Sequence, residues 1–156
     1  MEKLAALCAL CCCGLGNEYS EELDKLFLEN PDDDFLFELE NLGKNYEAAW
    51  EILREKITDK FYFENELFKS LGKYYESGEI TLREFAVRCN DLIEDVVVGY
   101  IEGKYADYMS GAFQTFCWLS DAVEGVLAAD EAERITEAKT AEIKRKFEAV
   151  FERYRE

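Results

Sequence analysis

Apolar residues recur at spacings of three and four along almost the whole chain, and this period constrains the fold more than any other feature. The spacing places apolar side chains on one face of an α-helix, whereas a half-buried strand would alternate with a period of two. Only one proline, Pro31, stands among the 156 residues. The stretch richest in β-branched residues, at 95–101, continues an apolar helical stripe. The sequence therefore predicts an all-α protein.

Capping residues divide this pattern into about seven to eight helices. The predicted helices cover residues 2–13, 18–30, 31–42, 45–57, 59–76, 81–100, 104–128 and 130–154. Asn30 caps the third helix with Pro31 at its first position, where no amide hydrogen is needed. Thr81 with Glu84, and Asp130 with Glu133, have the spacing of capping boxes.

The chain is about one domain long and contains 49% hydrophobic residues, enough to fill a single core. No internal repeat, linker or low-complexity segment divides it. We therefore predict that residues 1–156 fold as a single-domain helical bundle.

The formal net charge of -17 narrows the classes of partner. Such a field repels nucleic acid and anionic lipid and attracts basic proteins. DNA, RNA and membrane surfaces are accordingly poor candidates, and a basic protein is the expected partner. The sequence leaves the oligomeric state open.

The first helix contains an apolar run of about a dozen residues after Lys3, which is too short to span a bilayer. No Ala-x-Ala cleavage site follows it, so we expect an internal helix of a cytoplasmic protein rather than a secreted lipoprotein. The six cysteines suit reduced thiols, because three of them are consecutive. Cys8, Cys11 and Cys12 share one helical face and could hold zinc, but buried apolar packing is the favoured interpretation.

Most routes to catalysis are closed because the chain contains no histidine. Neither a serine or cysteine triad nor a histidine metal site can be built, and no Gly-rich phosphate loop precedes a helix. We predict no cofactor and no catalytic residue. The remaining enzymatic alternative is a magnesium-dependent phosphohydrolase that uses Asp32, Asp33, Asp34 and Glu38, although these lack the D-D-x-x-D spacing.

Acidic residues are concentrated near the amino end. Residues 17–41 contain ten acids and one base, for a net charge of -9, whereas residues 131–156 contain seven of each.

A helical projection of residues 31–42 places Phe35, Leu36, Leu39 and Leu42 on one face and Phe37 on the other. Phe37 is then either an apolar anchor with an acidic rim or a second core contact. The predicted partner-binding residues are Glu21, Glu22, Asp32, Asp33, Asp34, Phe37, Glu38 and Glu40. Tyr62, off the stripe formed by Phe61, Leu67 and Phe68, is a weaker candidate.

The segment "NPDDDFLFELENL", together with small size and strong acidity, resembles bacterial immunity-type proteins, which neutralise toxins. The resemblance implies a toxin as partner and transfers no catalytic residue. We therefore expect an inhibitor that occludes a basic toxin. The alternatives are the phosphohydrolase and a helical scaffold or regulatory subunit, in which the apolar stripe of the final helix would form a homo-oligomer seam.

Overall fold

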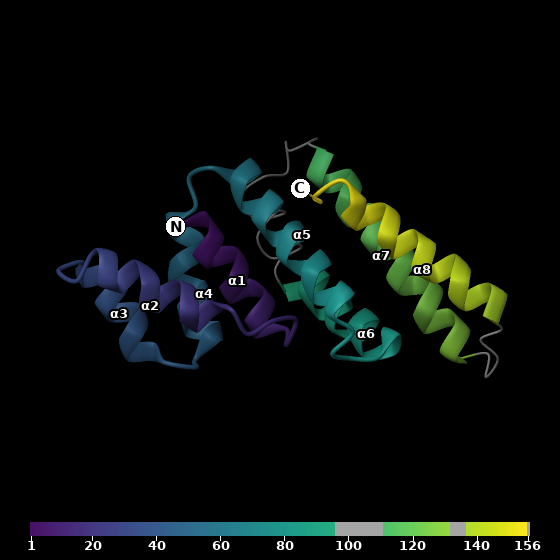
Figure 1. The fold of residues 1–156 in the computed structure, drawn as a ribbon, viewed down its shortest axis with the longest axis horizontal. Coiled ribbons are helices and arrows are strands. Elements are labelled where there is room, and N and C mark those ends of the chain that lie inside the picture. Colours follow the sequence, from purple (N-terminus) through teal and green to yellow (C-terminus); the bar gives the residue numbers. More distant parts are fainter. Residues whose placement is uncertain (96–110, 132–136, 156) are drawn as a thin grey trace. The chain divides into compact units, whose positions relative to one another are not determined.

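A computed structural model describes residues 1–95, 111–131 and 137–155. These residues form eight α-helices and one short 3-10 helix and contain no strand, which confirms the all-α prediction (Figure 1). The helices are α1 (Glu2–Cys12), α2 (Tyr19–Glu29), α3 (Asp34–Leu42), α4 (Tyr46–Leu53), η1 (Arg54–Lys56), α5 (Lys60–Ser77), α6 (Leu82–Leu92), α7 (Gly111–Glu131) and α8 (Glu137–Glu152).

The chain divides into two compact units, an N-terminal unit (Met1–Ser70) and a C-terminal unit (Leu71–Glu156). The boundary falls within α5, so the first turns of this helix belong to one unit and its last turns to the other. Folding of the whole chain as a single domain stays a prediction.

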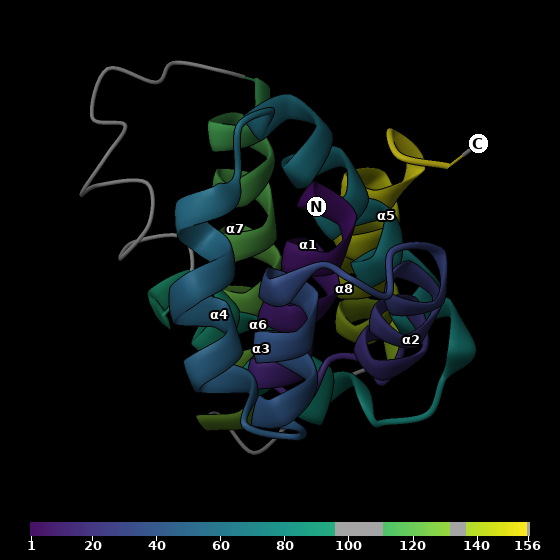
Figure 2. The same ribbon diagram turned by 90° about the vertical axis from the view of Figure 1, so that its left-hand side faces the viewer.

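The N-terminal unit is organised around α1. Every side chain from Leu4 to Cys11 is buried, and a helix that is apolar on all sides is stable only inside a core. Helices α2 and α4 pack against α1, and α3 packs against both α2 and α4 (Figure 2). The apolar run after Lys3, which has the composition of a secretion signal, is thus the central helix of this unit.

Polar contacts connect the start of α1 to the turn before α5, and an aromatic contact connects α4 to α5. Glu2 accepts hydrogen bonds from the backbone N–H groups of Thr58 and Asp59, each at 3.0 Å, in the turn before α5. Burial alone would raise the pKa of Glu2, but these hydrogen bonds outweigh it and lower the pKa to about 2. The rings of Trp50 and Phe63 stack at a centroid distance of 5.9 Å and connect α4 to α5.

The C-terminal unit contains the last turns of α5 and helices α6, α7 and α8. Helix α7 packs against both α6 and α8. An aromatic cluster of Tyr75, Phe85, Phe147 and Phe151 joins α5, α6 and α8, with ring centroids 5.1 to 6.4 Å apart. The backbone of Gly72 approaches this cluster closely, since a Cβ added there would lie 3.1 Å from the Cβ of Phe151.

The apolar stripe of the final helix is used inside the chain. Ile143, Phe147, Val150 and Phe151 are all buried, each with an exposed fraction of 2% or less. These four residues of the stripe are therefore not available for the homo-oligomer seam that the scaffold alternative proposed.

Two predicted helix starts, at Pro31 and Asp130, are wrong, whereas the predicted caps Asn45 and Thr81 are confirmed. Helix α3 begins at Asp34 with Asp33 as its cap, so Asn30 and Pro31 lie in the preceding turn. Helix α7 continues to Glu131, which places Asp130 inside a helix rather than at a cap. The capping box of Thr81 and Glu84 is present, with both hydrogen bonds formed.

Three predicted segments lie wholly or partly outside the described residues. After α6, residues 93–95 continue as a π-helical turn, and the predicted continuation to residue 100 lies beyond the described range. The start of the seventh predicted helix, at 104–110, and the residue Glu133 of the second predicted capping box lie outside it as well.

The six cysteines are present as thiols and not as disulfides. Cys8, Cys11, Cys13 and Cys89 are buried, as expected for cysteine used as a small apolar residue. A hydrogen bond with Cys12 and burial both raise the pKa of Cys8, so this thiol stays protonated. Cys117, in α7, is exposed.

A candidate protein-binding surface on an acidic hairpin

Helices α2 and α3, with the turn at 30–33, form a hairpin that carries most of the predicted site residues; we call it the acidic hairpin. Tyr19 and Leu23 of α2 and Leu36 and Leu39 of α3 are its buried side chains. Their spacings of three and four define one inward face on each helix. The remaining faces of both helices are available for charged side chains.

The three consecutive aspartates have separate roles. Asp33 Oδ1 accepts hydrogen bonds from the N–H groups of Phe35 at 2.9 Å and Leu36 at 3.2 Å, so its side chain caps α3. Asp32 and Asp34 are exposed, and within the described residues their side chains form no ion pair. Asp34 also lies in the first turn, where a negative charge is favourable to the helix dipole. The cluster is thus a helix start that presents two unpaired carboxylates to solvent.

Phe37 lies on the outward side of α3 with 57% of its surface exposed. This decides between the two interpretations of the sequence, because a core phenylalanine would be almost fully covered. Its neighbour Glu38 is also exposed. An exposed aromatic ring among carboxylates has the composition of a binding anchor with a charged rim.

Leu28, on α2, is a second exposed apolar residue of the hairpin. Unlike Phe37, it was not among the predicted partner-binding residues. Its exposed fraction of 81% is the largest among the exposed bulky apolar side chains of the described residues. A projection at 100° per residue would have found it, since Leu28 lies 140° from the buried Leu23. The acidic hairpin therefore carries one exposed apolar side chain on each of its helices.

Glu22 does not take part in the outward surface. Its Oε2 lies 2.7 Å from Nζ of Lys3, and the Glu22 side chain is only 16% exposed. The ion pair connects α2 to α1 and also raises the pKa of Lys3. We therefore assign Glu22 to the attachment of the hairpin, whereas Glu21 is exposed and unpaired within the described residues.

Glu40 is half-buried where α3 faces α2. Burial raises its pKa, and the charge of Asp24 together with a hydrogen bond between the two side chains raises it further. Two acidic side chains from different helices thus meet at the hairpin's inner edge, and they repel each other when both are ionised. A cation approaching this edge would relieve their mutual repulsion.

The start of α5 carries two exposed aromatic side chains, Phe61 and Tyr62. Phe61 is 68% exposed and Tyr62 is 48% exposed. The sequence stripe placed Phe61 in the core, and this placement is wrong, whereas Leu67 and Phe68 of the same stripe are fully buried. Tyr62 lies outside the stripe, as predicted, but no cluster of exposed acids comparable to that of the hairpin surrounds it in sequence.

Within the part of the chain that the structure describes, no three Asp, Glu or Cys side chains are grouped so that they could hold a metal ion. No helix among the described residues is both long enough and apolar enough to cross a membrane. Comparison with protein-family models, with curated proteins and with solved structures finds no match to this chain. The resemblance to immunity-type proteins therefore stays a hypothesis.

Proposed function

We propose that the chain is a protein-binding inhibitor and that its acidic hairpin binds and occludes a basic partner, such as a toxin. The observation that carries the proposal is Phe37, exposed on the outward side of α3 and accompanied by the exposed carboxylates of Asp34 and Glu38. Leu28 gives a second apolar contact on α2. Exposed bulky apolar side chains of this kind are typical of binding anchors.

Charge explains why the partner should be basic. The segment 17–41 has a net charge of -9, which is more than half of the chain's -17. Such a patch steers a basic protein toward the hairpin and increases the rate of association. A carboxylate surface can also occupy a basic active site that normally receives phosphate groups, which is the occlusion that the resemblance implies.

The structure narrows the surface that we propose. Its members are Glu21, Leu28, Asp32, Asp34, Phe37 and Glu38, whose side chains are exposed. Asp33 and Glu22 hold the hairpin in place, Asp33 through the cap of α3 and Glu22 through the ion pair to Lys3. Glu40, next to Asp24, lies at its inner edge.

Binding measurements on variants test this proposal once a partner has been captured. We expect Phe37→Ala, and separately Leu28→Ala, to weaken binding by about tenfold or more, as truncation of an anchor does. Changing Asp32, Asp33 and Asp34 together to Asn should also weaken it while preserving the cap, because Asn caps helices as well as Asp. Val87→Ala is the matched control, since Val87 is an exposed apolar residue of α6, in the other unit. If the control weakens binding as much as Phe37→Ala does, the hairpin is not the binding surface.

The other two functions gain no specific observation. For the phosphohydrolase, Asp33 is used as the cap of α3, and no three acidic side chains of the described residues are grouped to hold a metal ion. For the scaffold, Ile143, Phe147, Val150 and Phe151 of the final helix are buried in the C-terminal unit. We therefore propose neither.

A further inference from the structure

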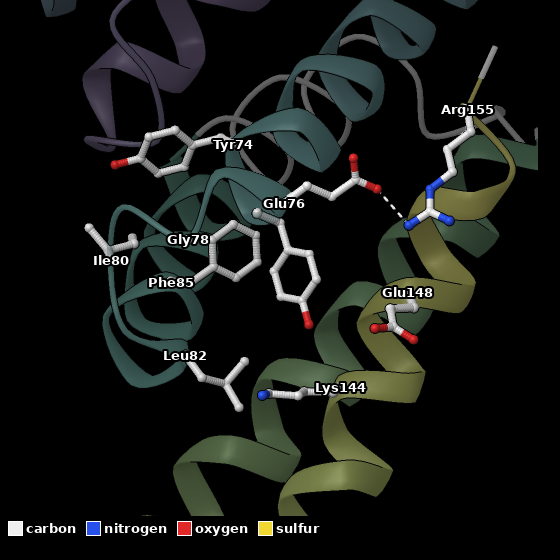
Figure 3. Close-up of a pocket in the computed structure, with 10 residues that line it drawn as sticks. Tyr74, Glu76, Gly78, Ile80, Leu82, Phe85, Lys144, Glu148 and Arg155 are labelled. Carbon is white, nitrogen blue, oxygen red and sulfur yellow. Dashed lines mark ion pairs between the residues drawn. The ribbon is translucent and has the colours of Figure 1, made fainter.

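A cavity of about 500 Å³ lies in the C-terminal unit, whereas the acidic hairpin belongs to the N-terminal unit. Its walls come from the end of α5, the turn into α6, the first turns of α6, and α8 with its C-terminal end (Figure 3). The volume falls in the range of small-molecule sites. The cavity is formed entirely by residues of one unit.

The cavity has an apolar wall that is held rigidly. Tyr75 and Phe85 line it and belong to the aromatic cluster, with their centroids 5.1 Å apart. Leu82 adds an aliphatic side chain at the start of α6. Because Phe85 is only 2% exposed and packs against Phe147, its ring cannot turn away to close the space. This wall suits the apolar part of a ligand.

Four charged side chains also line the cavity, and two of them neutralise each other. Arg155 forms an ion pair with Glu76 across the upper part of the cavity (Figure 3). This pair satisfies both groups, so neither of them requires a ligand. The other two charged side chains are those of Lys144 and Glu148, which project from α8.

Lys144 and Glu148 are one helical turn apart and are not paired. Within the described residues, no ion pair or hydrogen bond involves the side chain of either. Lys followed by Glu four residues later is also the less favourable orientation of such a pair. Figure 3 shows Lys144 extending from α8 toward Leu82, so its ammonium reaches over the cavity. The charge of Glu148 acts within the cavity as well: after burial, it is the second cause that raises the pKa of Tyr75.

The spacing of the two charges selects a class of ligand. Four residues along α8 correspond to a rise of about 6 Å between the two Cα atoms. Lys144 extends away from Glu148 toward Leu82, so the gap between the two charges is wider than this rise (Figure 3). An α-amino acid carries its ammonium and carboxylate on one carbon, and with a hydrogen bond of about 2.8 Å on each side it bridges a gap of roughly 8 Å. Its side chain would then lie against the apolar wall.

We propose that this cavity binds a free α-amino acid with a bulky apolar side chain. Lys144 binds the carboxylate, Glu148 binds the ammonium, and the side chain packs on Tyr75, Phe85 and Leu82. The site is independent of the acidic hairpin, so its test and the test of the inhibitor proposal have separate outcomes.

Calorimetric titration of the full chain with defined ligands tests the chemistry without any mutation. We expect L-phenylalanine or L-leucine to bind with a dissociation constant on the order of 1 mM, given the small number of ligand atoms. N-acetyl-L-phenylalanine lacks the ammonium, 2-phenylethylamine lacks the carboxylate and glycine lacks the side chain. Each should bind at least about tenfold more weakly. Equal binding of these analogues, or no binding of the two amino acids at ten times the expected constant, would overturn the proposal.

Paired variants place the ligand in the cavity. Lys144→Gln and Glu148→Gln should each weaken L-phenylalanine binding by about tenfold. Arg145→Gln and Glu152→Gln make the same charge changes at exposed positions of α8 that do not line the cavity, and they should leave binding unchanged. Circular dichroism spectra of the four variants establish that each is folded. If the two control variants weaken binding as much as the cavity variants do, the ligand binds elsewhere and the assignment fails.

Discussion

Leu36 and Phe37 are adjacent in the sequence but have opposite environments, with exposed fractions of 3% and 57%. Truncation of Leu36 leaves a cavity in the core, so Leu36→Ala should lower the free energy of unfolding by about 2 to 5 kcal/mol. Phe37→Ala removes an exposed ring and should change it by less than about 0.5 kcal/mol. Urea denaturation of the two variants measures both values. A loss for Phe37→Ala as large as that for Leu36→Ala would mean that Phe37 is a core residue.

Glu2 makes the stability of the N-terminal unit depend on pH. Its pKa is lowered from an ordinary 4.5 to about 2, so its contribution is fully present above pH 4.5 and is lost as the pH falls toward 2. Glu2→Gln should therefore lower the free energy of unfolding by about 1 to 3 kcal/mol near pH 7. The difference from the unmodified protein should shrink between pH 4.5 and 2. Denaturation curves at several pH values measure it, and a difference independent of pH would contradict the role given to the carboxylate.

Exposure of single residues could be predicted from the sequence only in part. The projection of residues 31–42 separated Leu36 from Phe37, because it measures the angle of each side chain around the axis. The same kind of projection failed for Phe61, which has the right angle but lies in the first turn of α5 and is 68% exposed. The angle of a side chain around the helix axis does not say whether a neighbouring helix extends far enough to cover the first turn of α5. The pairing of Glu22 with Lys3 was also hidden, because it depends on how α2 lies on α1.

Two helical glycines differ in what surrounds them, and the difference predicts opposite effects of alanine. A Cβ at Gly72 of α5 would lie 3.1 Å from Cβ of Phe151, which the aromatic cluster holds in place. We expect Gly72→Ala to destabilise the protein by about 1 to 3 kcal/mol through overpacking. A Cβ at Gly125 of α7 would make an ordinary contact at 3.6 Å, so Gly125→Ala should gain up to about 1 kcal/mol of helix propensity. Thermal unfolding of both variants measures the two changes in stability. Stabilisation by Gly72→Ala would show that α5 and α8 are not packed closely at this point.

Helix existence and type could be predicted from periodicity, whereas some boundaries could not. Thr81 was identified because a threonine and a glutamate at capping-box spacing precede an apolar stripe, and both hydrogen bonds are present. The start of α3 was placed three residues early, since Asn30, Asp32 and Asp33 are all good caps and differ little in energy. Asp33 is the cap in the fold, with Leu36 and Leu39 of α3 directed into the core.

The two units each contain one tryptophan, Trp50 in the first and Trp118 in the second. Trp118→Phe leaves fluorescence that reports on the N-terminal unit, and Trp50→Phe leaves fluorescence that reports on the C-terminal unit. If residues 1–156 form a single domain, the two variants should each unfold in one transition that coincides with the loss of helical circular dichroism. Transitions that differ between fluorescence and circular dichroism in the same variant would show two independently folding domains.

Salt should act on the whole molecule and on its complex in opposite directions. Self-repulsion from the net charge of -17 weakens the fold at low ionic strength, so added salt should raise the thermal unfolding temperature. The same screening should weaken the complex with a basic partner. Release of a partner by salt would then not result from unfolding.

The most direct test of the inhibitor account is capture of a partner from the lysate of the cells that make the protein, at low and then at high salt. The tagged protein, its Phe37→Ala variant and its Val87→Ala variant serve as bait, and mass spectrometry identifies what is eluted. The account predicts a basic protein that is retained by the unmodified bait and by Val87→Ala, lost from Phe37→Ala, and released by salt. A partner retained equally by all three baits and insensitive to salt, or no basic protein at all, would contradict it.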